Sequence, residues 1–162
     1  MIVHMTLSYN LYKPCLAAFL LSMLLFSGLV WARAGSDEWY EGPDGYKQAY
    51  AQHQKTGDPL LLYFYAPWCG YCRKLDQTLL VNAQVKSFLR SYIKVRVYSE
   101  ATEAGRQLAN KLGVRGFPDM HVWYKNACNG EVSPFRYDAR NDTWAMASPS
   151  VFIRSIENMC HR

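Results

Sequence analysis

The sequence has little from which a metal site could be built. Among its five cysteines only Cys69 and Cys72 form a Cys-x-x-Cys pair, and no His-x-x-x-His pattern occurs anywhere. A structural zinc site takes four ligands, usually from two such pairs at matched spacing. The single pair therefore argues against zinc and favours a reactive dithiol, with an inert structural bridge as the remaining alternative.

The chain also lacks a strong charge excess, an internal repeat and a low-complexity tract. Over 162 residues it has 18 basic and 13 acidic side chains, a net charge of +5. These charges are dispersed along the chain, which argues against nucleic acid or a membrane surface as a partner. The length and the apolar content suit one domain with a proper hydrophobic core.

Residues 1–34 have the pattern of a secretory signal peptide. A polar start with Lys13 precedes an uncharged stretch, residues 15–32, and Ala32-Arg33-Ala34 supplies a small-x-small cleavage motif. The uncharged stretch is short for a membrane span, so an uncleaved N-terminal anchor is the alternative. Either way, the sequence predicts a periplasmic or otherwise extracytoplasmic domain.

Cleavage after residue 34 would leave 16 basic and 13 acidic residues, a net charge of +3, because the leader contains Lys13, Arg33 and no acid. Cys15 would be lost with the leader, and four cysteines would remain. An even number of cysteines in an exported protein is typical of two disulfides.

The rest of the chain predicts a leading polar segment, residues 35–45, followed by one α/β domain, residues 46–162. Residues 138–148 form an insertion without an assigned element, and we expect its Trp144 to pack against the domain. In chain order the predicted elements are a helix over 46–55, a strand over 59–65, a helix over 70–80, a short helix opened by Asn82, a strand over 93–98, a helix over 101–112, a hairpin of strands 119–124 and 132–137, and a last helix opened by Ser148-Pro149. The helix over 101–112 is expected to pack through an apolar stripe of Ala101, Ala104, Leu108 and Leu112.

The Cys-x-x-Cys pair lies where the first predicted strand gives way to a helix. Cys69 is thus expected at a helix N-terminus, where unpaired N–H groups and the helix dipole favour a thiolate, with Arg73 and Lys74 adding positive charge. Lowering a thiol pKa by about two units from about 8.5 corresponds to about 2.7 kcal/mol. We therefore expect Cys69 to be the nucleophile and the more buried Cys72 to resolve the mixed disulfide.

Two motifs together resemble the thioredoxin superfamily, over about residues 46–160. They are Tyr65-Ala66-Pro67-Trp68-Cys69-Gly70-Tyr71-Cys72, which is similar to protein disulfide isomerase domains, and Gly113-Val114-Arg115-Gly116-Phe117-Pro118. The leading helix and the broken helix after Cys72 look like the exported thioredoxin-like domain of the bacterial transmembrane disulfide reductase.

The resemblance implies a thioredoxin fold, with a mixed four-stranded central sheet flanked by helices. It also implies that Pro118 is cis and that Trp68, Gly70, Tyr71, Phe117 and Pro118 bind substrate. For Trp68, shielding of the disulfide is an equally good interpretation.

The sequence departs from the family pattern at three places. Thioredoxins and isomerase domains have a buried carboxylate six residues before the first cysteine, and here that residue is Tyr63. Proton removal from Cys72 is thus left to water, to the Tyr63 hydroxyl or to no dedicated group. Asp119 follows the proline where threonine is more usual, and Gly70-Tyr71 replaces the Gly-Pro of strongly reducing members.

In the topology that the family implies, Cys128 and Cys160 lie together at the end of the sheet away from the dithiol. A strand of six residues spans about 20 Å, so this pair cannot join Cys69 and Cys72 around one metal ion. We expect the two cysteines to form a structural disulfide.

The functional expectation is an extracytoplasmic thiol-disulfide oxidoreductase that exchanges disulfides with protein thiols and disulfides, reducing or isomerising them. A membrane protein is a candidate electron donor. Neither a metal nor an organic cofactor is required, because the sulfur pair carries the electrons. The alternative from another class is a binding module that holds Cu(I) on the Cys69 and Cys72 thiolates and delivers it to a partner.

Overall fold

The structure is a computed structural model, and it describes residues 37–161. The expected signal peptide, residues 1–34, lies outside the described residues together with Cys15. No helix between residues 37 and 161 combines the length and the apolar character that crossing a bilayer takes.

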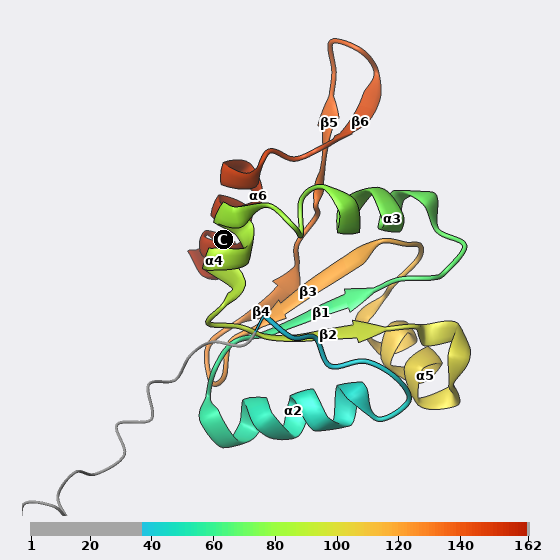
Figure 1. Cartoon of the computed structure of the whole chain (residues 1–162), viewed down its shortest axis with the longest axis vertical. Coiled ribbons are helices and arrows are strands. Elements are labelled where there is room, and N and C mark those ends of the chain that lie inside the picture. Colours follow the sequence, from blue (N-terminus) through green and yellow to red (C-terminus); the bar gives the residue numbers. More distant parts are fainter. Residues whose placement is uncertain (1–36, 162) are drawn as a thin grey trace, which may run out of the picture. The chain divides into compact units, whose positions relative to one another are not determined.

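A mixed four-stranded sheet forms the centre of the domain, in the order β2-β1-β3-β4 (Figure 1). Strand β1 (Leu60–Phe64) runs parallel to β2 (Ile93–Val97) and antiparallel to β3 (Asp119–Trp123). The short β4 (Asn129–Glu131) completes the sheet antiparallel to β3. The sequence prediction of a mixed four-stranded sheet with flanking helices is confirmed.

Strand β1 is buried on both faces, which explains its unbroken apolar sequence. Its register places Tyr63 opposite Arg96 of β2 and opposite Met120 of β3. Paired residues of neighbouring strands point to the same face of a sheet. Tyr63 and Arg96 are thereby brought together on one face, although 33 positions separate them in sequence.

Helices cover both faces of the sheet (Figure 1). The face to which Leu61 and Tyr63 point packs against α3 (Gly70–Gln77), α4 (Ala83–Leu89) and α6 (Pro149–Glu157). The opposite face, with Leu60, Leu62 and Phe64, packs against α2 (Gly45–Thr56) and α5 (Glu103–Leu112). The side-chain alternation of one strand thus supports two separate hydrophobic clusters.

Most predicted helix ends agree with the structure, and two are wrong. The helix predicted over 70–80 ends at Gln77, with Thr78 as its C-cap. Asn82 caps α4 as predicted, its side chain accepting from the amides of Gln84 and Val85. The helix predicted over 101–112 instead begins at Glu103, because Thr102 accepts a hydrogen bond from the Gly105 amide and acts as the N-cap. Residues Ser99–Ala101 form a separate 3-10 turn, η1.

The apolar stripe predicted for that helix is right at Leu108 and at Leu112, which packs against the core half-buried, and wrong at its two alanines. Ala101 and Ala104 are exposed, and the buried side chains of α5 are those of Leu108 and Ala109. The short alanine side chains bury little apolar area, so they do not decide which face of the helix packs.

The C-terminal hairpin differs from its prediction. The strand paired with β3 is Asn129–Glu131, not residues 132–137. Residues Phe135–Asp138 instead form β5, which pairs with β6 (Thr143–Met146) in a separate two-stranded sheet. The unassigned insertion, residues 138–148, is therefore largely a β-hairpin that stands beyond α3 in Figure 1. Its Trp144 is 63% exposed and does not pack into the core.

The described part of the leading polar segment joins the sheet edge. Tyr40 forms a parallel bridge to Val95, with its amide donating to the Lys94 carbonyl at 2.8 Å. The Arg96 amide donates in turn to the Tyr40 carbonyl at 2.9 Å. This bridge carries Glu41 to within 3.3 Å of Arg96.

Candidate active site

Cys69 is the N-cap of α3, directly after the loop that leaves β1. Its backbone is extended (φ −73°, ψ 109°), and its sulfur accepts a hydrogen bond from the Cys72 amide at 3.0 Å. The two cysteines form a disulfide with their Cα atoms 5.2 Å apart. A sulfur at an N-cap lies where the unpaired amides of the first helical turn converge, so this site stabilises negative charge on Cys69.

Charged side chains near Cys69 reinforce that preference. The first turn of α3 contains no acidic residue. The Arg73 guanidinium folds back and donates to the Pro67 carbonyl at 3.0 Å, which holds a positive charge beside the loop that precedes the dithiol. A cation close to a thiol lowers its pKa because it stabilises the thiolate.

The second predicted motif borders the dithiol. The Phe117–Pro118 peptide bond is cis, as expected. Phe117 makes an edge-to-face contact with Trp68, their ring centroids 5.8 Å apart. A pocket of about 530 Å³ lies along this loop. Its lining residues are Gly113, Arg115, Gly116, Phe117, Pro118, Asp119 and Glu131.

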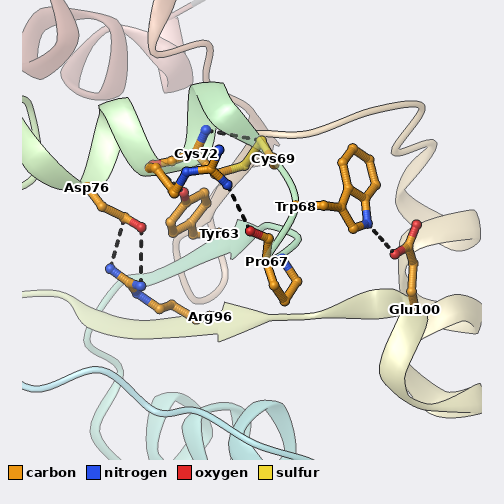
Figure 2. The surroundings of a disulfide bond; sticks show 9 residues. Tyr63, Pro67, Trp68, Cys69, Cys72, Asp76, Arg96 and Glu100 are labelled. Atoms are coloured by element: carbon orange, nitrogen blue, oxygen red, sulfur yellow. Dashed lines mark hydrogen bonds and ion pairs between the residues drawn. A yellow bond between two sulfur atoms is a disulfide. The ribbon is translucent and has the colours of Figure 1, made fainter.

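Two large aromatic side chains are exposed beside the disulfide. Trp68 is 64% and Tyr71 is 61% exposed. Trp68 is nevertheless oriented, because its indole N–H donates to the Glu100 carboxylate at 3.0 Å (Figure 2). Tyr71 makes an edge-to-face contact with Phe135 of the β5–β6 hairpin, at 5.6 Å between centroids. The hairpin thus begins next to the dithiol.

Gly70 lies between the disulfide and the exposed tyrosine. A Cβ at this position would meet only the Arg73 guanidinium, at 3.8 Å. Crowding by neighbouring atoms therefore does not require a glycine here. Without a side chain, Gly70 leaves its own backbone open beside Cys69.

Sequence reasoning missed a polar cluster that lies under α3. Asp76, one turn after Cys72, forms hydrogen bonds to the Arg96 guanidinium at 2.9 and 3.4 Å (Figure 2). The Tyr63 hydroxyl donates a hydrogen bond to the Cys72 carbonyl oxygen at 3.4 Å.

Burial perturbs both titrating groups of this cluster. It raises the pKa of the Asp76 carboxyl, an effect that the Arg96 charge partly offsets. Burial also raises the pKa of the Tyr63 hydroxyl, and the neighbouring Asp76 charge adds to the rise. Tyr63 therefore stays protonated over the physiological range. The i, i+4 spacing of Cys72 and Asp76 is the sequence signal that could have indicated the cluster.

The remaining cysteines lie on other elements. Cys128 is in the turn between β3 and β4, and Cys160 is in the 3-10 turn η2 (Met159–His161). The structure joins them in a disulfide with a Cα separation of 5.6 Å. The structure does not bring this pair together with Cys69 and Cys72.

Metal ligands do not converge elsewhere in the described part of the chain. Within residues 37–161 no three His, Cys, Asp or Glu side chains come together in a metal-binding arrangement. The copper alternative thus depends on Cys69 and Cys72 alone.

Comparisons with known proteins agree on one family. A family model described as a thioredoxin-like domain matches residues 46–138. Protein disulfide-isomerase A6 of Mesocricetus auratus is 35% identical over 84 residues, which are 51% of this chain and 18% of that protein. Protein disulfide-isomerase tigA of Aspergillus niger is 37% identical over 70 residues, 43% of this chain and 19% of that protein. The matched region thus covers about a fifth of these relatives' length.

Among solved structures, the oxidised C-terminal domain of DsbD from Neisseria meningitidis superimposes with a TM-score of 0.55. It is 18% identical, and the match covers 75% of this chain and 98% of that one. An oxidoreductase named DsbH gives the same TM-score at 15% identity, over 80% of this chain and 88% of that one. At these identities the likeness concerns the fold, which is the thioredoxin fold.

Proposed function

The chain belongs to the thioredoxin-like family, and we propose that it is a thiol-disulfide oxidoreductase that works outside the cytoplasm by exchanging disulfides with protein substrates. One observation carries the proposal: the Cys69–Cys72 disulfide lies at the N-terminus of α3, beside cis-Pro118 and two exposed aromatic side chains. Such a surface supplies both a reactive sulfur and a place for substrate to bind.

In the reducing direction Cys69 is the nucleophile. Its thiolate attacks one sulfur of a substrate disulfide, so that a mixed disulfide forms and one substrate thiolate leaves. Cys72 then attacks Cys69, the Cys69–Cys72 bond forms, and the second substrate thiolate leaves. Two electrons have passed from the dithiol to the substrate. In isomerisation the same mixed disulfide forms first. Another thiolate of the substrate then attacks it, so that a different substrate disulfide forms and Cys69 leaves as a thiolate.

The substrate-binding surface consists of the residues that surround the disulfide. The backbone of Phe117, before cis-Pro118, pairs with an extended substrate segment, as an added strand pairs with a sheet edge. The Trp68 and Tyr71 rings contact apolar substrate side chains, and Gly70 leaves room for the substrate backbone. These residues are the proposed substrate-binding site.

Two features support the extracytoplasmic location. Residues 1–34 have the pattern of a signal peptide or N-terminal anchor. The Cys128–Cys160 disulfide is of a kind that persists in oxidising compartments and is rare in the cytosol. An exported reductase needs a source of electrons, and we propose a membrane protein as its donor.

The direction of electron flow follows from the reduction potential of the dithiol. The helix N-terminus and Arg73 stabilise the reduced form, since they stabilise its thiolate. We propose an intermediate potential, suited to reducing or isomerising wrong disulfides. Equilibration with glutathione measures it: a value near about −120 mV indicates a disulfide donor, and one near about −270 mV a dedicated reductase.

Insulin reduction with dithiothreitol tests the activity. The purified domain should accelerate precipitation of the insulin B chain, and the Cys69→Ser variant should be inactive. The Cys72→Ser variant should trap the substrate as a mixed disulfide on Cys69. Activity in the Cys69→Ser variant, or a protein that takes up Cu(I) stoichiometrically and reduces no insulin, would contradict the proposal.

A further inference from the structure

The β5–β6 hairpin, which stands beyond α3 in Figure 1, is amphipathic. In its antiparallel register Phe135 lies opposite Met146, and Tyr137 lies opposite Trp144. Directly opposed residues, and every second residue along a strand, share one face of a sheet. These four side chains therefore form a single apolar face. The other face of the hairpin carries Arg136, Asp138, Thr143 and Ala145.

The inner half of the apolar face packs against the helix that carries the dithiol. Phe135 contacts the Tyr71 ring edge to face at 5.6 Å, and the Thr78 hydroxyl donates to the Met146 sulfur at 2.9 Å. Tyr71 and Thr78 are seven positions apart, which is about two helical turns. Both contacts thus lie on the same side of α3, and they hold the base of the hairpin beside the disulfide.

The outer half of the same face is uncovered. Tyr137 is 51% and Trp144 is 63% exposed, although large aromatic side chains are usually well buried. Their rings contact each other at 5.6 Å between centroids, and the Tyr137 hydroxyl donates to the Asp142 carboxylate. The two rings are therefore held in place by each other and by the turn, while much of their surface faces solvent.

A pocket adjoins the apolar face at the base of the hairpin. Its volume is about 370 Å³, and Phe135 and Tyr137 line it together with Val151 of α6 and Met159 of η2. Apolar walls with a few polar groups are typical of sites that bind an apolar group and fix its orientation. The polar residues of the lining are Glu131, Ser133, Arg136 and Ser155.

We propose that the face formed by Phe135, Tyr137, Trp144 and Met146, the docking face, binds an aromatic or aliphatic side chain from an unfolded segment of the protein substrate. The inference rests on the proposed function of the dithiol, whose binding surface it extends. Continuity with the dithiol supports this occupant, because the exposed Tyr71 contacts Phe135 directly. Proteins that lack their correct disulfides also expose apolar side chains, which the native fold would bury.

The strand geometry sets the distance from the substrate cysteine. Tyr137 lies two residues beyond Phe135, which is about 7 Å along a strand. Added to the 5.6 Å between the Tyr71 and Phe135 rings, this places the exposed pair up to about 13 Å from Tyr71. An extended chain covers that distance in about four residues. The docking face thus binds side chains about four residues from the substrate cysteine, whereas Trp68 and Tyr71 contact nearer ones.

A set of single-cysteine peptides tests this reach. Each peptide is a Gly-Ser chain whose cysteine is activated as a pyridyl disulfide, with tryptophan next to the cysteine, four residues from it on either side, or absent. The Cys72→Ser variant attacks each peptide once, and release of pyridinethione gives the rate. Tryptophan four residues away, on at least one side, should raise the rate by about threefold or more. Equal rates with and without the distant tryptophan overturn the proposal.

Two further substitutions in that background locate the effect on the hairpin. Tyr137→Thr/Trp144→Thr removes both rings and keeps residues that favour a strand. It should abolish the advantage of the distant tryptophan and keep that of the adjacent one. Ala145→Thr is the matched control, because Ala145 is exposed on the opposite face of the same hairpin. A distant-tryptophan advantage that survives the double substitution, or that Ala145→Thr also abolishes, overturns the proposal.

Nuclear magnetic resonance of the oxidised protein tests docking without disulfide exchange. The ligand is the insulin B chain with its cysteines alkylated. The indole N–H signal of Trp144, assigned by its loss in the double variant, should shift during the titration. The signal of Trp123, which packs on the α2 side of the sheet, should stay in place. A Trp144 signal that does not move overturns the proposal.

The outcomes separate the docking face from the proposed function. If the peptide without tryptophan forms no adduct on Cys69, the proposed function fails, whereas the B-chain titration still decides whether the docking face binds a polypeptide. If all peptides form adducts at one rate, the function stands and the docking face is refuted. Sedimentation at several protein concentrations examines a second copy of the chain as the occupant. A dimer that Tyr137→Thr/Trp144→Thr dissociates would overturn the proposal.

Discussion

The amide of Cys72 donates a hydrogen bond to the sulfur of Cys69 at 3.0 Å, so the second cysteine of the pair helps to stabilise charge on the first. The reverse bond does not exist, because the Cys69 amide donates to the Ala66 carbonyl at 3.0 Å. This asymmetry distinguishes two cysteines that are almost equally buried, at 4% and 2% exposure. We therefore expect the two thiols to differ in reactivity for an electrostatic reason.

The first prediction is that Cys69 is the reactive thiol of the reduced protein. Iodoacetamide should label Cys69 with a midpoint well below pH 8, because the helix N-terminus and Arg73 favour its thiolate. Rates measured across pH in the Cys72→Ser variant give this midpoint, and the Cys69→Ser variant serves as the control. A midpoint near about 8.5, the value of a free cysteine, would refute the assignment.

The second prediction concerns substrate contact by Trp68. Trp68→Ala should lower kcat/KM toward a protein disulfide by about twofold to tenfold, as expected for the loss of one aromatic contact of about 0.5–1.5 kcal/mol. The rate with a small aromatic disulfide should change little, because such a substrate needs only the sulfur. Tyr50→Ala is the control, since Tyr50 is an aromatic residue exposed at 40% on α2, which packs on the opposite face of the sheet. Equal losses with both kinds of disulfide would favour the shielding role instead.

The third prediction is that the Cys128–Cys160 disulfide stabilises the domain without taking part in the reaction. The two cysteines are 32 positions apart, so their removal should cost about 3–4 kcal/mol of unfolding free energy in the chain-entropy account. Urea unfolding of the Cys128→Ser/Cys160→Ser variant measures the cost, and insulin reduction should be retained below the unfolding range. Peptide mapping of the unreduced protein that found both thiols free would remove the basis of this prediction.

The fourth prediction concerns a buried lysine at the sheet edge. Lys94 is 4% exposed, its ammonium donates to the Leu89 and Tyr92 carbonyls, and burial lowers its pKa. The unfolded chain then binds this proton more tightly than the folded chain. The resulting penalty is present in full below the folded pKa and is lost as the pH rises toward about 10.4, the unfolded value.

The stability of the native protein relative to Lys94→Met should therefore increase with pH over that alkaline window. Urea unfolding of both proteins at several pH values provides the comparison, and Lys111→Met, which changes an exposed lysine, serves as the reference. A difference in unfolding free energy that stays constant with pH would show that burial does not perturb this group.

Local patterns in the sequence were enough to predict much of the fold. The apolar run of β1, the Asn82 cap and the Cys-x-x-Cys pair at a strand end are each set by neighbouring residues. The hairpin of β5 and β6 was not predicted, because its local pattern is too short. Each of its strands has four residues, the shortest run over which an alternation of apolar and polar residues can indicate a strand.

The sequence by itself thus determined the chemistry of the protein: a dithiol at a helix N-terminus, with a cis-proline loop beside it. Only the tertiary structure decided what surrounds Cys72. Asp76 and Arg96 are 20 positions apart, and the parallel pairing of β1 with β2 brings Arg96 next to Tyr63 beneath α3. Strand pairing and helix packing set such contacts, and no local pattern encodes them, because the hydrogen-bonded atoms meet only when the core has formed.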